Sequence, residues 1–122
     1  MKIMNCVDKG HRGEDLAVAF LFAKKYRILT RNWRIKAGEI DIIALDGETL
    51  VFCEVKSRSS TRFGTGAEAV DARKQRKIVQ VAMLYLQRYS LWNQRCRFDV
   101  IEILQPSLGE PQIRHFINAF NG

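Results

Sequence analysis

Two stretches of the chain carry apolar residues at helical spacing. In residues 13–26, GEDLAVAFLFAKKY, apolar positions recur every three or four residues, with acids at the start and lysines at the end. This order of charges favours a helix. Residues 67–90 form the longest such stretch, and their apolar stripe consists of Ile78, Val81, Ala82, Tyr85 and Tyr89. We therefore predict one helix near the start of the chain and a longer one in its second half.

Other segments are rich in β-branched and aromatic residues, as is typical of strands. They are residues 27–35, the two arms of a hairpin within residues 38–60, residues 96–104 and residues 112–117. For the last of these we favour an edge strand over a short helix. An Asp-Gly pair separates the two arms of the hairpin, and residues 60–66, STRFGTG, have the composition of a loop.

The predicted order of elements is helix, strand, strand, strand, helix, strand, strand. The long helix between the hairpin and residues 96–104 can form the crossover that two parallel strands need. We therefore predict an α/β fold with a central mixed β-sheet of about five strands flanked by α-helices. The length of 122 residues, without any linker-like stretch, predicts a single domain over residues 1–122.

The hairpin has one apolar face and one mixed face, because side chains alternate along a strand. The apolar face consists of Ile40, Ile42, Ala44, Val51, Cys53 and Val55. The mixed face is apolar near the turn and charged at the far end, where Asp41, Glu54 and Lys56 lie. Both faces are therefore expected to be covered, with the charged residues at one end of the sheet.

The register of the hairpin decides whether Asp41 and Glu54 meet. A four-residue loop places Leu45 opposite Leu50 and therefore Asp41 opposite Glu54. A two-residue loop leaves the two acids diagonal to each other on the same face. A three-residue loop would separate them and bury the apolar side chains less consistently, so we reject it.

Two opposed, half-buried carboxylates repel each other and are costly without a positive charge between them. Lys56 supplies one such charge, and a divalent cation with oxygen ligands would supply two. The plain alternative is a structural ion pair between Glu54 and Lys56 or a neighbouring arginine. Because the three residues lie in a hairpin of matching parity, we favour the cation site.

Composition adds a class of partner to this picture. The formal net charge of +7 favours an anionic partner, most often nucleic acid, although a solvated cationic surface is the plain alternative. The three cysteines form no CxxC pair, which argues against a zinc site. No apolar run is long enough to cross a bilayer and no signal peptide is evident, so we expect a cytoplasmic protein without a membrane partner.

Asp41 and, further along the hairpin, the tripeptide EVK at residues 54–56 together resemble the PD-(D/E)xK nuclease signature, with Ile40 in place of the usual proline. Over a longer range, GEDLA, GEIDIIA, LVFCEVKSR, RFG, RFD and NAF resemble the YraN-like family of uncharacterised nuclease-fold proteins, from about residue 10 to residue 120. The first helix and the hairpin are also similar to archaeal Holliday junction resolvases. The resemblance implies a restriction-endonuclease-like fold but brings no established substrate.

In this resemblance Asp41 and Glu54 are the metal ligands, for Mg²⁺ with Mn²⁺ as a substitute. Lys56 would orient the attacking water or hold a phosphate oxygen, unless it only balances the charge of the two acids. Glu14 resembles the first-helix glutamate that completes the metal site of resolvase-like nucleases, but an acid at a helix N-terminus is also favourable in its own right. Glu39 shares the face of Asp41, and we favour a surface residue at the start of the strand over an acid in the outer shell of the metal site.

Several basic residues are candidates for contacts with a phosphate backbone. They are Arg31, Arg34, Arg58, Arg62, Arg73, Lys74 and Lys77. Arg58 and Arg62 belong to the segment that directly follows the motif. Lys74 lies one turn before Ile78 on the apolar stripe of the second helix, so its side chain is expected to face the core or the cleft, and we favour a phosphate contact for it.

We therefore expect a metal-dependent endonuclease that hydrolyses phosphodiester bonds, in DNA rather than RNA. No base-reading motif is present, so recognition would depend on shape or backbone, as in branched or damaged DNA. The main alternative is a nucleic-acid-binding module of the same fold with weak or no turnover. A third alternative is a basic structural protein whose hairpin acids form ion pairs only. A homodimer would suit branched substrates, and the oligomeric state stays open.

Overall fold

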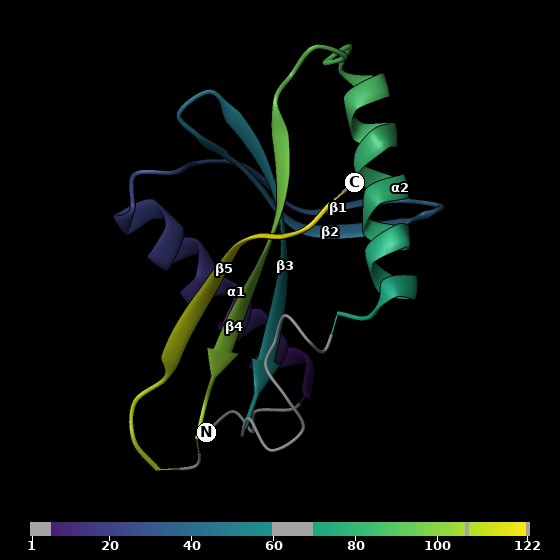
Figure 1. Ribbon diagram of the computed structural model, residues 1–122. Coiled ribbons are helices and arrows are strands. Elements are labelled where there is room, and N and C mark those ends of the chain that lie inside the picture. Colours follow the sequence, from purple (N-terminus) through teal and green to yellow (C-terminus); the bar gives the residue numbers. More distant parts are fainter. Residues whose placement is uncertain (1–5, 60–69, 107, 122) are drawn as a thin grey trace.

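The computed structural model describes residues 6–59, 70–106 and 108–121. Its elements are, in chain order, α1 (Cys6–Ala23), β1 (Arg27–Ile35), β2 (Gly38–Asp46), β3 (Thr49–Arg58), α2 (Ala72–Arg88), β4 (Cys96–Leu104) and β5 (Gln112–Phe120). The strands form one five-stranded sheet in the order β1-β2-β3-β4-β5 (Figure 1). The predicted order of helices and strands is confirmed.

The sheet is mixed, because one of its four strand pairs is parallel. β3 pairs with β4 in parallel, and the other neighbours pair antiparallel. α2 connects the two parallel strands, as a crossover must. The α/β fold with a mixed sheet flanked by helices is therefore confirmed, and β1 and β4 have the bounds that the sequence predicts.

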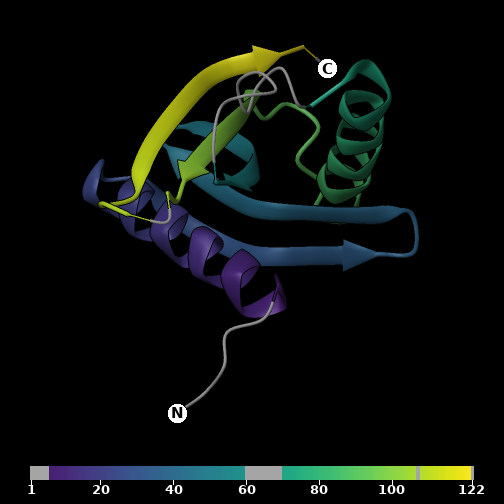
Figure 2. The ribbon, with the colours of Figure 1, turned by 90° about the horizontal axis from the view of Figure 1, so that it is seen from below.

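Each face of the sheet packs on one helix and has its own apolar core. Towards α2, the buried side chains include Ile43, Phe52 and Val81. Towards α1, a second cluster includes Ile42 and Cys53. Figure 2 shows the two helices on opposite sides of β2. The predicted alternation is therefore confirmed for the part of the hairpin nearest the turn, and both of its faces are covered.

Ile40 is an exception to this alternation, and its predicted position is wrong. We expect it on the same face as Ile42, which lies in the α1-side cluster, but Ile40 packs in the α2-side cluster. The β2–β3 ladder ends at Ile42, so residues 38–41 pair with β1 alone and turn towards α2. There, a Cβ on Gly38 would lie 3.0 Å from Val81 Cγ2. Alternation along a strand does not predict where the strand leaves its partner, and here that departure brings Ile40 into the other core.

α2 starts later than the sequence predicts, at Ala72, and residues 67–69 lie outside the described residues. Asp71 is the N-cap: its backbone is extended, with a ψ of 175°, and its Oδ1 accepts a hydrogen bond from the backbone N–H of Lys74 at 2.9 Å. An aspartate side chain satisfies one of the unpaired N–H groups of a helix start. The end at Arg88, instead of residue 90, is within the usual fraying of a helix terminus.

Replacing Asp71 by Ala is expected to lower the free energy of unfolding by about 1 kcal/mol, because the N–H of Lys74 loses its acceptor. Urea denaturation followed by circular dichroism measures this change. Glu110→Ala, which removes an exposed acid from the β4–β5 connection, is the control and should change stability by less than about 0.5 kcal/mol. Equal stability of Asp71→Ala and the wild type would mean that the cap contributes nothing.

α1 begins at Cys6, well before the predicted start at Gly13. Gly13 is buried inside the helix, where a Cβ would overlap the hydroxyl group of Ser57. Glycine therefore allows α1 to approach β3 closely and does not mark a helix boundary. Neither of the helices in the described ranges is long and apolar enough to span a membrane.

The last element is a strand, and it extends further than the predicted residues 112–117. β5 continues to Phe120, which pairs with Phe98 of β4 and stacks on its ring at a centroid distance of 5.2 Å. An irregularity in the register lies beside Asp99, whose Oδ1 accepts a hydrogen bond from the backbone N–H of Asn118 at 2.9 Å. This polar contact holds β5 on β4 where the regular ladder is interrupted.

Candidate functional site

The register of the hairpin brings Asp41 and Glu54 to the same end of the sheet. Leu45 pairs with Leu50, which confirms the register predicted with the four-residue loop, although Asp46 and Thr49 also pair and leave only Gly47 and Glu48 in the turn. β2 leaves β3 at Asp41, and the side chain of this residue takes the place of a ladder contact. Its Oδ2 accepts a hydrogen bond from the backbone N–H of Val55 at 2.8 Å. Asp41 is therefore fixed by the strand that carries Glu54.

Burial, and then the negative charge of Glu54, raise the pKa of Asp41 to about 7. The N–H of Val55 acts in the opposite direction, and the charges of Glu14 and Glu39 add smaller increases. Glu54 is itself buried, with 6% of its surface exposed. Two carboxylates that share a dry environment resist ionising together, and a cation bound between them would remove this repulsion.

Two lysines from different elements approach the same oxygen of Glu54. Lys56 Nζ, on β3, lies 3.6 Å from Oε1, and Lys74 Nζ, on the first turn of α2, lies 3.7 Å from it. Both distances exceed that of a hydrogen bond, so the ammonium groups offset the carboxylate charge without being fixed to it. Both side chains remain partly exposed. Lys74 thus points towards the acids, where its place on the apolar stripe predicts it.

Glu14, the candidate third ligand, is buried on α1 and contacts β1. Its Oε1 accepts hydrogen bonds from Asn32 Nδ2 at 2.8 Å and from Arg31 Nε at 3.1 Å. Asn32 has a left-handed backbone, with a φ of 50°, which Asn tolerates better than most residues. The charge of Glu14 contributes to the raised pKa of Asp41. Sequence reasoning missed Asn32, for which no periodic signal exists.

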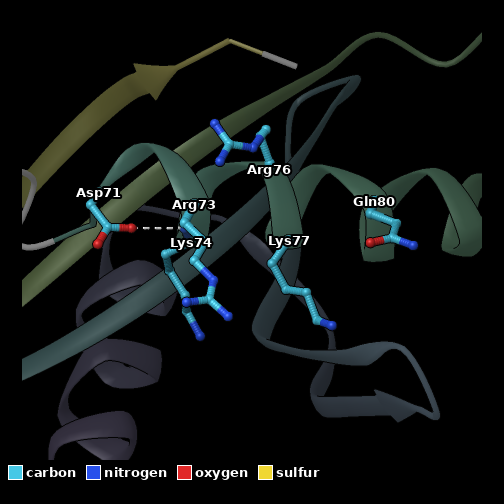
Figure 3. Close-up of a pocket in the computed structure, with 6 residues that line it drawn as sticks. All are labelled: Asp71, Arg73, Lys74, Arg76, Lys77 and Gln80. Atoms are coloured by element: carbon cyan, nitrogen blue, oxygen red, sulfur yellow. Dashed lines mark hydrogen bonds between the residues drawn. The ribbon is translucent and has the colours of Figure 1, made fainter.

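The first turns of α2 line a basic groove with a cavity volume of about 510 Å³. Its lining residues are Asp71, Arg73, Lys74, Arg76, Lys77 and Gln80. Figure 3 shows Arg73, Lys74 and Lys77 extending to one side of the helix and Arg76 to the other. Because Lys74 also approaches Glu54, the groove adjoins the two acids. Arg76 was not among the predicted contact residues, and it adds a fourth cation.

Three other predicted contact residues lie against acids. Arg31 pairs with Asp15 at 2.5 Å in addition to Glu14, Arg34 pairs with Glu39 at 2.7 Å, and Arg58 lies 3.5 Å from Glu102. Arg62 lies outside the described residues. The predicted basic residues therefore divide into two groups: the arginines of the sheet are held by carboxylates, whereas Arg73 and Lys77 line the groove on α2.

The residues present fit a magnesium ion bound by two carboxylates. In the part of the chain that the structure describes, no three His, Cys, Asp or Glu side chains lie close enough together to hold a metal ion. Mg²⁺ is commonly held by one or two carboxylates and keeps several of its waters. Asp41 and Glu54 carry oxygen atoms of the kind that Mg²⁺ prefers, and such an ion would relieve the repulsion between the two acids. A role for Glu14 as a third ligand stays a prediction.

These observations define the class of the protein. It is an α/β protein whose mixed sheet carries a buried and a half-buried carboxylate, Glu54 and Asp41, with two lysines near Glu54 and a basic groove beside it. Residues 13–103 match the family described as "Uncharacterised protein family UPF0102". The chain belongs to the UPF0102 family, which confirms its resemblance to the YraN-like family.

Relatives of similar length come from several bacteria. The chain is 49% identical over 112 residues to a UPF0102 protein of Geotalea daltonii, covering 92% of this chain and 88% of that protein. It is 48% identical over 112 residues to one of Symbiobacterium thermophilum, covering 92% and 95%. It is 46% identical over 117 residues to one of Clostridioides difficile, covering 96% and 100%. The family is described as uncharacterised, so membership alone assigns no activity.

Proposed function

We propose that this protein is a metal-dependent nuclease that hydrolyses phosphodiester bonds in DNA. The observation that carries the proposal is the hairpin register, which brings Asp41 beside Glu54 at the end of the β2–β3 ladder. Two lysines lie within 4 Å of one oxygen of Glu54. Acids that bind a metal ion, together with cations that bind phosphate, are one arrangement that supports hydrolysis of a phosphodiester.

Asp41 and Glu54 would hold the ion through their carboxylate oxygens, which are the ligands that Mg²⁺ and Mn²⁺ prefer. When bound, such an ion supplies a nucleophile from water at neutral pH and offsets the charge that develops on the phosphate. The N–H of Val55 keeps Asp41 in position through its hydrogen bond. The buried setting keeps the number of competing waters low and strengthens the attraction of both acids for a cation.

Lys56 and Lys74 would bind the substrate phosphate. Both approach Oε1 of Glu54 at more than hydrogen-bond distance and remain partly exposed. A cation at Glu54 would compete with the two ammonium groups for this oxygen. Each ammonium group, once displaced, can donate to a phosphate oxygen, which gives a strong charge-assisted contact. Lys56, on the same strand as Glu54, is the better placed of the two to orient the attacking water.

The groove on α2 would continue the site along the DNA backbone. Arg73 and Lys77 are four residues apart and lie on one side of the helix (Figure 3), so they can contact successive phosphates. Side chains of this kind read charge and shape rather than base identity. Branched or damaged DNA is therefore a better substrate class than a specific sequence. The resemblance to Holliday junction resolvases favours DNA over RNA.

A nucleic-acid-binding module of the same fold, with weak or no turnover, is the second candidate. In its favour, Oε1 of Glu54 has two ammonium neighbours and Oε1 of Glu14 has two hydrogen-bond donors. If these contacts persist in the presence of metal ions, the acids only balance the charge of basic residues. Binding of DNA without metal-dependent cleavage is the result expected for such a module.

Cleavage of labelled branched, nicked and single-stranded DNA, and of matched RNA, tests the proposal in Mg²⁺, Mn²⁺ or EDTA. We expect cleavage with either metal, none in EDTA, and none by Glu54→Gln. Glu48→Gln removes an acid from the exposed β2–β3 turn and should cut like the wild type. Binding without cleavage by the wild type would support the module instead. Undiminished cleavage by Glu54→Gln would place the catalytic centre elsewhere.

Replacing Arg73 and Lys77 together by Ala is expected to weaken DNA binding at least about tenfold. The slope of log affinity against log salt concentration should become shallower by about two, since each phosphate contact contributes about 0.9. Fluorescence anisotropy over a salt series measures both quantities. Replacing Arg88 and Arg95, two exposed arginines away from the groove, removes the same charge and should change the slope little. A groove variant with the wild-type slope would contradict backbone binding on α2.

A further inference from the structure

Glu102 on β4 is a fully buried carboxylate that the proposed catalytic site does not use. Its exposed fraction is 0%, and neither side-chain oxygen accepts a hydrogen bond within the described part of the chain. Burying an ionised carboxylate is costly unless positive charge surrounds it. An apolar side chain would meet the packing requirement at this position, as it does at the neighbouring Ile101 and Ile103. Packing alone therefore does not account for a glutamate at this position.

Two arginines surround Glu102 from the neighbouring strands. Arg58 Nη1, on β3, lies 3.5 Å from Oε2, and Arg114 Nε, on β5, lies 3.9 Å from Oε1. These are charge contacts rather than hydrogen bonds, because both exceed hydrogen-bond distance. The side chain of Arg114 is about half exposed, at 51%, and that of Arg58 retains 17%. Glu102 thus draws one guanidinium group from each neighbouring strand towards β4.

The strand register places these residues next to the proposed catalytic site. Glu102 pairs with Lys56 across β3–β4 and with Arg114 across β4–β5, so the three residues form a transverse row on the face that carries Glu54. Neighbouring strands lie about 4.8 Å apart, which puts Arg114 on the order of 10 Å from Lys56. In Figure 1 the C-terminal ends of β3 and β4 extend past the N-terminal end of α2. The row therefore continues the site beyond the first turn of that helix.

We propose that Arg58 and Arg114 form a second phosphate-binding subsite, aligned by Glu102, which holds the DNA backbone next to the phosphate that is cut. The inference rests on the proposed nuclease function and adds the path of the substrate strand, across the C-terminal halves of β3 and β4 to β5. Guanidinium groups bind phosphate oxygens through paired N–H donors. Two arginines and one carboxylate leave a net charge of +1, which complements one phosphodiester. Glu102 is a positioning residue and touches no substrate.

The variant Glu102→Gln distinguishes alignment of the two arginines by Glu102 from simple electrostatic attraction between the protein and DNA. The substitution removes a negative charge, so attraction alone would tighten DNA binding. Loss of alignment should instead raise the Kd about tenfold, the effect of losing one charge-assisted contact. Fluorescence anisotropy in EDTA measures binding without cleavage, so the result does not depend on catalysis. Glu48→Gln makes the same change of charge at the other end of β3 and should not weaken binding.

Arg114→Ala keeps the test valid if Glu102→Gln folds poorly, because Arg114 is half exposed. We expect a Kd about tenfold higher and a salt slope shallower by about one, with partial recovery in Arg114→Lys. An unchanged Kd in Arg114→Ala, or tighter binding by a folded Glu102→Gln, would overturn the subsite even if Glu54→Gln abolishes cleavage. Conversely, the wild type could fail to cut DNA while both variants lose DNA binding. That result would support the subsite and overturn the nuclease function.

Discussion

Replacing Asp41 by Asn is expected to lower metal-dependent cleavage of DNA by at least about a thousandfold, which corresponds to about 4 kcal/mol of transition-state stabilisation. The amide removes the charge that a divalent cation requires. It retains an oxygen that can accept the N–H of Val55, as Oδ2 of Asp41 does at 2.8 Å, so the hairpin should keep its structure. Single-turnover cleavage in Mg²⁺, with the preferred substrate, measures the change.

Binding of DNA to Asp41→Asn in EDTA should be equal to or tighter than binding to the wild type, because a negative charge near the basic groove is lost. Glu48→Gln, at the turn of the same hairpin, controls for the removal of an acid and should cut normally. Cleavage by Asp41→Asn within about tenfold of the wild-type rate would contradict its role as a metal ligand. Loss of both binding and folding would indicate a structural role instead.

The stability of the metal-free protein should fall as the pH rises from about 4 to about 7. Burial and the charge of Glu54 raise the pKa of Asp41 from 3.8 to about 7. Within this window the native state holds a proton that the unfolded chain has released, so the free energy of unfolding decreases with rising pH. It stays low above pH 7. Since one pKa unit corresponds to about 1.4 kcal/mol, the loss is on the order of 4 kcal/mol at most.

Asp41→Asn should lack this loss of stability, because Asn does not titrate. In EDTA at pH 8 the variant is expected to be more stable than the wild type by a few kcal/mol, and at pH 4 about equally stable. Urea denaturation across the pH range gives the difference between the two proteins, in which the titrations of other groups cancel. Mg²⁺ at pH 8 should raise the stability of the wild type only. A variant that is less stable than the wild type at pH 8 would contradict repulsion between Asp41 and Glu54.

The hairpin and its register were predictable because both follow from local rules. Alternation decides which side chains share a face and excludes a three-residue loop. Of the two registers that remained, the structure has the one that pairs Leu45 with Leu50. The placement of Asp41 and Glu54 at the same end of the hairpin follows from the same parity, although the ladder ends at Ile42, before the two acids pair directly. β1 and β4 were equally predictable from the sequence, since each is a short run of β-forming residues between turns. The presence of two lysines near the acids was predictable from the spacing of the motif and from the apolar stripe of α2.

Features that depend on distant segments were not predictable in this way. Gly13 resembles a helix boundary in the sequence, but it lies inside α1 because β3 approaches the helix there. Ile40 lies in the other core because β2 turns towards α2 after its ladder with β3 ends. Asn32 and Glu102 carry no periodic signal of their own. Their roles depend on partners that the fold brings close, such as Arg114 on the neighbouring strand.

The position of a bound metal ion tests the central claim most directly. Crystals of the wild type soaked in Mn²⁺ would reveal the ion by its anomalous scattering, without any assumption about the substrate. We expect one Mn²⁺ ion between Asp41 and Glu54, with oxygen atoms of both side chains as ligands, and no such ion in crystals of Asp41→Asn. At saturating Mn²⁺, an empty site between these two acids, or an ion bound without contact to either of them, would contradict it.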